Sequence, residues 1–262
     1  YIGVKDIEGP FILVENVSGV GYGELVDIRD GKGVRRHGQV KSLSEKATLV
    51  QVFTGTEELV PNTTKVRFLG KPLEVHLSRY MLGRTFNGLG EPRDGCGEIY
   101  GGKRVNINGL PLNPMARQYP RDFIHTGISA IDTLTTLIRG QKLPIFSGNG
   151  LPHNQLAVQI ATQAKVVGSE EFAVVFAGIG VKHDDAAYFT QELSTRGHSN
   201  NIVTFLNLAD DPVIERIATP RMALSTAEYL AYELGMHVLV IRTDMTSYCE
   251  ALREFSSSKG EI

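Results

Sequence analysis

The segment Ser147-Gly-Asn-Gly-Leu-Pro-His-Asn154 joins an apolar run to a stretch with helical periodicity. Glycines at such a junction let backbone N–H groups approach a phosphate, and the dipole of the following helix favours the negative charge. A P-loop adds a lysine that contacts the phosphates and a hydroxyl that binds Mg²⁺, in the pattern G-x-x-x-x-G-K-[ST]. In this alignment the four signature positions are Ser147, Pro152, His153 and Asn154, and none of them matches.

Each replacement weakens phosphate binding without excluding it. Pro152 has no N–H to donate, and Asn154 offers an amide where Mg²⁺ is normally bound by a hydroxyl. His153 is shorter than lysine and mostly neutral at pH 7, and losing a charge-assisted contact to phosphate forfeits roughly 1.5–3 kcal/mol. Two interpretations stay open. The segment is either an ordinary strand–turn–helix junction with Pro152 as its first helical residue, or a degenerate nucleotide-binding loop. The loop residues are Ser147, Gly148, Asn149, Gly150, Leu151, Pro152, His153 and Asn154.

Asp244 is a second candidate, because it closes an apolar run that begins at residue 237. An acid at the end of a buried strand is where a Walker B carboxylate reaches Mg²⁺, directly or through water. It is equally the position of an N-cap for a helix that starts near Thr246. The 7 histidines are scattered without ligand spacing. The sequence therefore predicts no metal site and no catalytic residue.

Short strands separated by turns predict a small all-β barrel over residues 1–68. No stretch with helical periodicity interrupts them. Predicted turns include Asp30–Gly33 and Ser44–Lys46. The predicted strands are Ile2–Ile7, Phe11–Glu15, Glu24–Ile28, Arg35–Leu43, Ala47–Phe53 and Lys65–Phe68.

Residues 69–143 are predicted to form a turn-rich connection. Glycine and proline are frequent there, but apolar side chains persist, which favours an ordered segment packed on a domain over a free tether. One short helix is expected at about residues 128–138.

Strands and helices alternate over residues 144–262, which predicts an α/β domain with a mostly parallel sheet. Ligands bind such sheets at the carboxyl ends of the strands. Thr219 and Pro220 are a suitable N-cap and first helical residue. The predicted strands are Pro144–Ser147, Phe172–Ile179, Ile202–Leu208 and His237–Thr243, and the predicted helices are 152–166, 184–196, 220–234 and 246–255.

Composition narrows the function classes. The 262 residues are 42% hydrophobic with a formal net charge of −2, so a core can form and the basic footprint of a dedicated nucleic-acid binder is missing. Cys96 and Cys249 cannot build a disulfide framework, which favours a reducing compartment. The longest apolar run, Phe172–Val181, is about half a membrane span. We therefore expect a cytosolic protein without direct membrane insertion.

The chain resembles the B subunit of V-type and archaeal A-type rotary ATPases, the non-catalytic sister of the catalytic A subunit. The resemblance covers essentially the whole chain, and the Gly-Leu-Pro-His-Asn run at the P-loop position is highly specific to that subunit. The matching segments are Met81-Leu-Gly-Arg-Thr-Phe-Asn-Gly88, Thr126-Gly-Ile-Ser-Ala-Ile-Asp132, Arg139-Gly-Gln-Lys-Leu-Pro-Ile-Phe-Ser147, Gly150-Leu-Pro-His-Asn154, Asp210-Asp-Pro212, Glu215-Arg-Ile217, Thr219-Pro-Arg-Met-Ala-Leu224, Ala227-Glu-Tyr-Leu-Ala-Tyr232 and Cys249-Glu-Ala-Leu-Arg253.

The resemblance implies a regulatory subunit without hydrolytic activity of its own. Catalytic relatives carry Gly-x-Gly-Glu-Arg after the second strand, and its glutamate activates the attacking water. The corresponding stretch here is Gly178-Ile-Gly-Val-Lys182, which puts Val181 at that position. Implied partners are the catalytic A subunit in an alternating A3B3 ring, a central-stalk rotor and peripheral-stalk subunits, on the cytoplasmic face of a membrane. No cofactor is intrinsic, and Mg-ATP or Mg-ADP is expected only at the interface with the A subunit.

The same resemblance implies a RecA-like second domain that is incomplete here, with the family's C-terminal helical domain absent. The family's arginine that reaches the catalytic nucleotide is expected beyond Ile262. The complex would couple ATP hydrolysis or synthesis to H⁺ or Na⁺ transport. Two alternatives remain: an autonomous P-loop ATPase with a divergent phosphate loop, and a Rho-like RNA translocase. The missing lysine and glutamate disfavour the first, and the charge balance disfavours the second.

Overall fold

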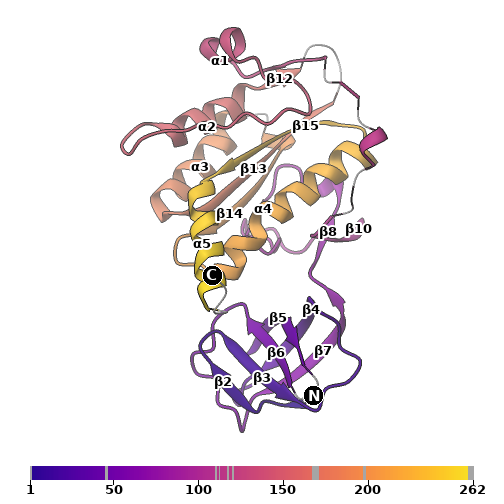
Figure 1. The fold of residues 1–262 in the computed structure, drawn as a ribbon. Helices are drawn as coiled ribbons and strands as arrows, with labels where there is room; N and C mark the ends of the chain where they lie inside the picture. Colours follow the sequence, from indigo (N-terminus) through magenta and orange to yellow (C-terminus); the bar gives the residue numbers. More distant parts are fainter. Residues whose placement is uncertain are drawn as a thin grey trace. The chain divides into compact units, whose positions relative to one another are not determined.

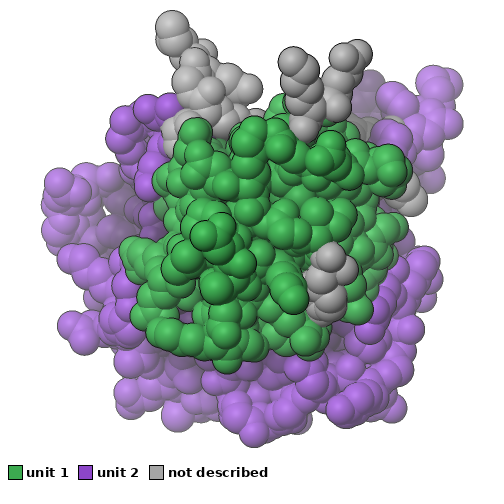
Figure 2. Space-filling model, turned by 90° about the horizontal axis from the view of Figure 1, so that it is seen from below, with its two compact units in different colours: residues 1–74, 212–214 green, residues 75–211, 215–262 purple. Residues whose placement is uncertain are grey.

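The structure is a computed structural model that describes residues 2–44, 47–109, 111, 113–116, 118–119, 121–166, 171–196 and 199–258. It contains two compact units, coloured separately in Figure 2. Unit 1 comprises residues 1–74 and 212–214, and unit 2 comprises residues 75–211 and 215–262. The first unit thus extends to residue 74, where the sequence predicts its end at residue 68.

Unit 1 is one antiparallel sheet in the order β1-β7-β4-β5-β6-β3-β2 (Figure 1). The predicted strand Ile2–Ile7 is wrong as a single element, because its first residues pair with β7 and its last with β3. The two edges of the sheet are therefore joined by one N-terminal stretch, which closes the barrel. The strands are β1 (Ile2–Gly3), β2 (Asp6–Glu8), β3 (Phe11–Glu15), β4 (Glu24–Arg29), β5 (Arg35–Leu43), β6 (Ala47–Val52) and β7 (Lys65–Pro72).

The core of unit 1 follows from the alternation of side chains along each strand. Val26 and Ile28 on β4 are fully buried, whereas Arg29 points outward and is exposed. Asp30 closes the following turn by accepting hydrogen bonds from the N–H groups of Lys32 (2.9 Å) and Val34 (2.8 Å). The predicted turn at residues 44–46 falls partly outside the described residues. The core comprises Val4, Ile12, Val14, Val26, Ile28, Val40, Val50, Val52, Leu59 and Val66.

The connection that begins unit 2 is ordered by short elements. β9 (Thr85–Phe86) runs parallel to β14 and so extends the main sheet of the unit. The N–H of Gly88 donates to the Glu215 carboxylate (2.9 Å), which fastens the turn after β9 to a helix far along the chain. The predicted helix at 128–138 is shorter in the structure. The remaining elements are β8 (Glu74–Leu77), β10 (Lys103–Asn106), β11 (Ile124–His125), α1 (Ser129–Leu134) and the 3₁₀ turns Arg79–Met81 and Pro114–Ala116.

Unit 2 is built on a parallel sheet in the order β15-β13-β14-β9. Helices cover both faces, with α2 and α3 on one and α4 and α5 on the other (Figure 1). Phe176 and Phe189, whose rings meet edge to face at 4.9 Å, join the sheet to α3. The elements are α2 (His153–Gln163), β12 (Lys165–Val166), β13 (Phe172–Val181), α3 (His183–Arg196), a 3₁₀ turn (Ser199–Asn201), β14 (Ile202–Leu208), α4 (Val213–Glu228), a π turn (Tyr229–Glu233), β15 (His237–Thr243) and α5 (Met245–Ser258).

The predicted strand Pro144–Ser147 is wrong, because the structure has irregular backbone there. A strand needs a neighbour for its N–H and C=O groups. Within the described residues, β15 is an edge strand that pairs with β13 alone, and nothing pairs with residues 144–147. Ile145 is exposed in consequence, and Phe146 is 93% exposed.

The predicted helices have different bounds in the structure, and α4 and α2 show why. α4 begins at Val213, and Pro220 lies inside it. Thr219 is therefore not an N-cap, and its hydroxyl donates to the carbonyl oxygen of Glu215 within the helix (2.8 Å). α2 ends at Gln163, because Lys165 and Val166 leave the helix to pair with β11. No helix in the described ranges is both long and apolar enough to cross a bilayer.

Candidate functional site

The carboxyl ends of β13, β14 and β15 lie at one edge of the sheet in unit 2, the edge where parallel sheets bind ligands. The residues that immediately follow these strands include Lys182, Ala209 and Asp244. The candidate loop 147–154 leads into α2, which packs beside α3.

The candidate loop is exposed from Ser147 to His153. Gly150 has φ +81°, a conformation that favours glycine, and the loop turns there. The N–H of Leu151 donates to the Gly148 carbonyl (3.3 Å), and the N–H of His153 donates to the Leu151 carbonyl (2.8 Å). In the described part of the chain, the N–H groups of residues 148–150 donate to no protein acceptor. Three donors are thus available to an anion, while the N–H groups of Leu151 and His153 are occupied and Pro152 has none.

The side chain of Asn154, the last residue of the loop, already has a hydrogen-bond partner within the chain. The side-chain amide of Asn154 donates to the Asp185 carboxylate at the start of α3 (3.0 Å). A carboxylate held at this point disfavours a second anion nearby. The position that binds Mg²⁺ through a hydroxyl in a P-loop instead ties two helices together. α2 begins at His153, one residue after the predicted start at Pro152.

Val181 ends β13 and belongs to the hydrophobic core, with only 6% of its surface exposed. It pairs in register with Leu208, and its carbonyl accepts the N–H of Ala209 (2.8 Å). The register shifts between Gly178 and Val181, which marks a bulge that sends the chain toward α3. The side chain at this position packs inside the unit and offers nothing to a ligand.

Gly180, inside that bulge, is surrounded by side chains to which the sequence assigned no role in the site. Its φ is +62°, its N–H donates to the Asn207 side chain (2.9 Å), and a Cβ there would lie 2.9 Å from Ser247 Cβ. Arg216 lies across it and donates to the Ala209 carbonyl (2.7 Å). These residues come from β14, α4 and α5, and only the Gly178-x-Gly180 spacing signalled a tight approach in the sequence. They fix the backbone immediately before Val181.

Asp244 is exposed at the start of α5. Its carboxylate accepts the N–H of Thr246 (2.9 Å), which is a capping contact of the kind that the sequence allows. The N–H of Asp244 itself is held by the Ile179 carbonyl (3.4 Å). A contact of Asp244 with Mg²⁺ remains a prediction. No set of three potential metal-ligating side chains occurs in the described ranges.

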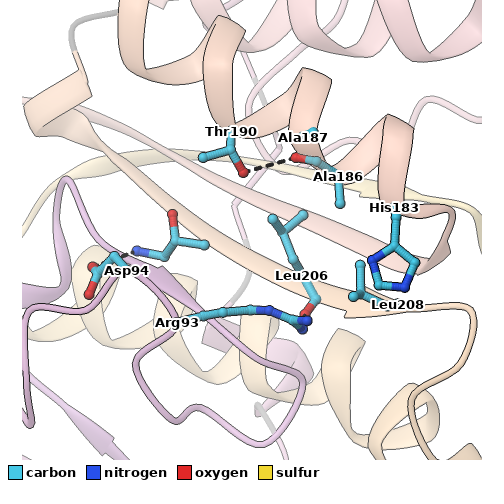
Figure 3. A pocket seen from close by; sticks show the side chains of 9 residues that line it. Arg93, Asp94, His183, Ala186, Ala187, Thr190, Leu206 and Leu208 are labelled. Atoms are coloured by element: carbon cyan, nitrogen blue, oxygen red, sulfur yellow. Dashed lines mark hydrogen bonds between the residues drawn. The ribbon is translucent and has the colours of Figure 1, made fainter.

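A cavity of about 250 Å³ lies beside β14 and α3 (Figure 3). Its charged groups already have partners: Arg93 contacts Asp211 (3.4 Å), and His183 contacts Asp210 (3.1 Å). Asp94 accepts a hydrogen bond from Arg84 Nη2 (2.9 Å). That hydrogen-bonded guanidinium holds the pKa of Asp94 well below its usual range. None of residues 147–154 lines this cavity, so it is distinct from the candidate loop.

Comparison with known proteins identifies the family. Residues 127–262 match the nucleotide-binding domain of the ATP synthase alpha/beta family, and residues 4–70 match its beta-barrel domain. The chain belongs to this family. The two matches confirm the predicted order of a β-barrel followed by an α/β domain with a parallel sheet.

Curated relatives of this family align with the whole chain. It is 61% identical to the V-type ATP synthase beta chain of Thermotoga neapolitana and 57% identical to that of Halothermothrix orenii. It is 56% identical to V-type ATP synthase beta chain 2 of Clostridium tetani. The alignments cover 100% of this chain but 57%, 57% and 58% of the relatives, so the chain spans a little over half of their length. The resemblance inferred from the motifs is thereby confirmed.

Proposed function

We propose that the chain belongs to a non-catalytic, regulatory subunit in the head of a V-type rotary ATPase. The observation that carries this proposal is the pairing of two losses at one edge of the sheet. Val181 is buried where a catalytic glutamate would act, and the loop at 147–154 has no lysine. A valine can neither orient water nor accept a proton, and the loop cannot neutralise a triphosphate.

The candidate loop fits an anion only in part. Three backbone N–H groups are available around Gly150, but Pro152 has none and the side chain of Asn154 is bound to Asp185. We infer that these residues do not form a complete Mg-ATP site. Nucleotide would then be held at an interface, with its main phosphate and metal contacts supplied by a catalytic partner subunit.

The expected partners follow from the names of the relatives, each a beta chain of a V-type ATP synthase. The proposal includes an alternating A3B3 ring with a catalytic A subunit, contact with central-stalk and peripheral-stalk subunits, and a place on the cytoplasmic face of a membrane. In that assembly, ATP hydrolysis or synthesis is coupled to H⁺ or Na⁺ transport. This chain would contribute conformational coupling without a hydrolytic base.

Steady-state ATP hydrolysis tests the proposal. We expect the full-length subunit alone to release phosphate no faster than a buffer blank, and an equimolar mixture with the catalytic subunit to hydrolyse ATP. Gly148→Ala changes the loop without a steric clash, because the added Cβ would lie 4.0 Å from Leu151 Cδ1. Hydrolysis by the isolated subunit would favour an autonomous ATPase. Failure to form a complex with the catalytic subunit would overturn the assignment to the head.

A further inference from the structure

Three asparagines of the chain are followed directly by glycine: Asn87, Asn108 and Asn149. In an Asn-Gly pair the backbone nitrogen of the glycine can attack the side-chain amide carbon, because no Cβ hinders the approach. The asparagine is thereby converted to an acid, a reaction known as deamidation. It needs a side chain that is free to move and a backbone N–H that is not already hydrogen-bonded. The sequence makes the three pairs equivalent, and the structure separates them.

Both reacting groups of the pair Asn87-Gly88 are held by hydrogen bonds. The N–H of Gly88 donates to the Glu215 carboxylate in a buried contact (2.9 Å). The side-chain oxygen of Asn87 accepts the N–H groups of Leu89 (3.0 Å) and Glu91 (2.9 Å). Its amide nitrogen donates to the side chain of Glu91 (3.0 Å). Attack at this pair would have to break several of these bonds, so we expect the pair to be stable.

The pair Asn108-Gly109 is held in a similar way. The N–H of Gly109 donates to the Asn106 carbonyl (3.1 Å). The side-chain amide of Asn108 donates to Asn106 Oδ1 (3.0 Å), and its oxygen accepts a hydrogen bond from Arg221 (2.8 Å). The nitrogen that would attack and the amide that would be attacked are thus both fixed.

The pair Asn149-Gly150 lies in the candidate loop and differs in both respects. Both residues are exposed, and a Cβ on Gly150 would meet only open space. In the part of the chain that the structure describes, the Asn149 side chain and the Gly150 N–H have no hydrogen-bond partner. The turn that contains them is closed by one bond, from the Leu151 N–H to the Gly148 carbonyl (3.3 Å). The protein therefore restrains neither reacting group.

We propose that Asn149 is a site of spontaneous deamidation in the folded protein. The Gly150 nitrogen bonds to Cγ of Asn149, the bond from Cγ to Nδ2 breaks, and ammonia leaves with the proton that the Gly150 nitrogen gives up. One water molecule then opens the resulting succinimide ring. Opening at Cγ gives aspartate, and opening at the backbone carbonyl gives isoaspartate. Water is the only co-reactant.

The modification changes the charge of the candidate loop. Either product replaces a neutral amide by a carboxylate, so the formal net charge of the chain changes by one, from −2 to −3. Isoaspartate also lengthens the main chain by one methylene. The new charge lies in the turn where the N–H groups of residues 148–150 are available to an anion. The reaction therefore acts against anion binding by the loop. The inference does not rest on the proposed function.

Incubation of the full-length subunit in mildly alkaline buffer made with heavy-oxygen water tests the inference. Ring opening during the incubation incorporates the heavy isotope, which separates it from deamidation during later digestion. We expect peptide mass spectrometry to find the labelled acid at position 149. It should accumulate at least about tenfold faster there than at Asn87 or Asn108, a factor comparable to the loss of one hydrogen bond to a charged group.

The unfolded subunit and two variants are the controls. In concentrated urea the three pairs lose their different surroundings and should react at similar rates. Asn149→Gln should abolish the fast reaction, because its longer side chain would have to close a larger ring. Asn149→Asp carries the charge of the product and identifies its position in ion-exchange chromatography.

Two outcomes would overturn the inference. In the first, Asn87 or Asn108 deamidates as fast as Asn149 in the folded subunit. In the second, Asn149 stays intact in the folded subunit over a time in which the unfolded chain deamidates. The rate in the subunit alone decides the inference, whereas failure to bind the catalytic subunit would count only against the proposed function.

Discussion

At the scale of single residues, Val181 limits the chemistry of the sheet edge. It is packed in the core of unit 2 and paired with Leu208, so its position is set by burial. A carboxylate introduced at this position would be buried among apolar side chains.

We therefore predict that Val181→Glu does not create an ATPase. The substitution should lower the free energy of unfolding by several kcal/mol, because a buried carboxylate without a partner is strongly destabilising. Chemical denaturation and phosphate release measure the two effects, and Val181→Ala separates the loss of packing from the burial of charge. Hydrolysis above the buffer blank by Val181→Glu would contradict the prediction.

The Arg84–Asp94 pair yields a pH-dependent prediction. The hydrogen-bonded guanidinium lowers the pKa of Asp94, so its stabilising effect is present above the unfolded-state pKa and is lost as pH falls through the folded-state value. We expect Asp94→Asn to cost about 1–2 kcal/mol at pH 7 and progressively less below about pH 4. Urea titrations at several pH values measure the difference. Glu250→Gln, which removes an exposed pair with Arg253, is the control and should have little effect. A pH-independent cost would exclude the ion pair as the cause.

At the scale of elements, the turn after β9 depends on how closely it approaches α4. A Cβ on Gly88 would lie 2.3 Å from Thr219 Oγ1 and 2.6 Å from Glu215 Cγ. The same approach buries Glu215, and that burial raises the pKa of its carboxyl, although the hydrogen bond from Gly88 opposes the rise.

We predict that Gly88→Ala destabilises unit 2 by about 1–3 kcal/mol, the usual cost of forcing an extra carbon into a packed site. Gly148→Ala, whose Cβ would meet only open space and one side chain at 4.0 Å, is the matched control and should be nearly neutral. Thermal unfolding measures both variants. If Gly88→Ala and Gly148→Ala changed the stability equally, the turn after β9 would be able to move away from α4 without loss of stability.

The irregular segment 144–147 yields a second prediction about elements. Because Phe146 is 93% exposed, we expect Phe146→Ala to change the stability of the 262-residue chain by less than about 0.5 kcal/mol. Phe176→Ala, in the buried sheet, should cost about 3–5 kcal/mol. A large cost at Phe146 would show that residues 144–147 form a buried strand after all.

At the scale of the whole molecule, each unit has its own hydrophobic core. We predict that Ile28→Ala, in the barrel, lowers the free energy of unfolding of unit 1 by about 2–5 kcal/mol. Tryptophan introduced separately into each unit provides a local probe, since the chain has none. If Ile28→Ala shifted both probes equally, the two units would unfold as one.

Most of the fold could be predicted from the sequence, because buried strands appear in it as apolar runs. β13, β14 and β15 are apolar runs of the kind expected for strands covered on both faces, and their starting residues were predicted correctly. The strand predicted at Pro144–Ser147 was wrong because an apolar run indicates only that a segment can form a strand. It does not show whether a neighbouring strand is present to pair with it. The predicted helix start at Pro220 was wrong for another reason. Proline usually occurs at the start of a helix, but here α4 continues past Pro220, next to the fully buried Thr219.

The candidate site was less accessible to prediction. The motifs singled out the loop and Val181, but Asn154 contacts Asp185, 31 residues away, and Arg216 lies against Gly180, which is also distant in the chain. No spacing rule connects such residues. Their partners depend on how α2, α3 and α4 are placed around the sheet.

The stretch that contains β1 and β2 closes the barrel, and this closure favours solubility. An open antiparallel sheet offers two rows of unpaired N–H and C=O groups, which can template pairing with another chain. Here a few residues cover both rows, with β1 on β7 and β2 on β3. Removing residues 2–8 would uncover two strand edges at once. A variant shortened in this way should self-associate through its barrel, with an aggregation rate that rises with protein concentration, even though the buried core of the unit remains nearly complete.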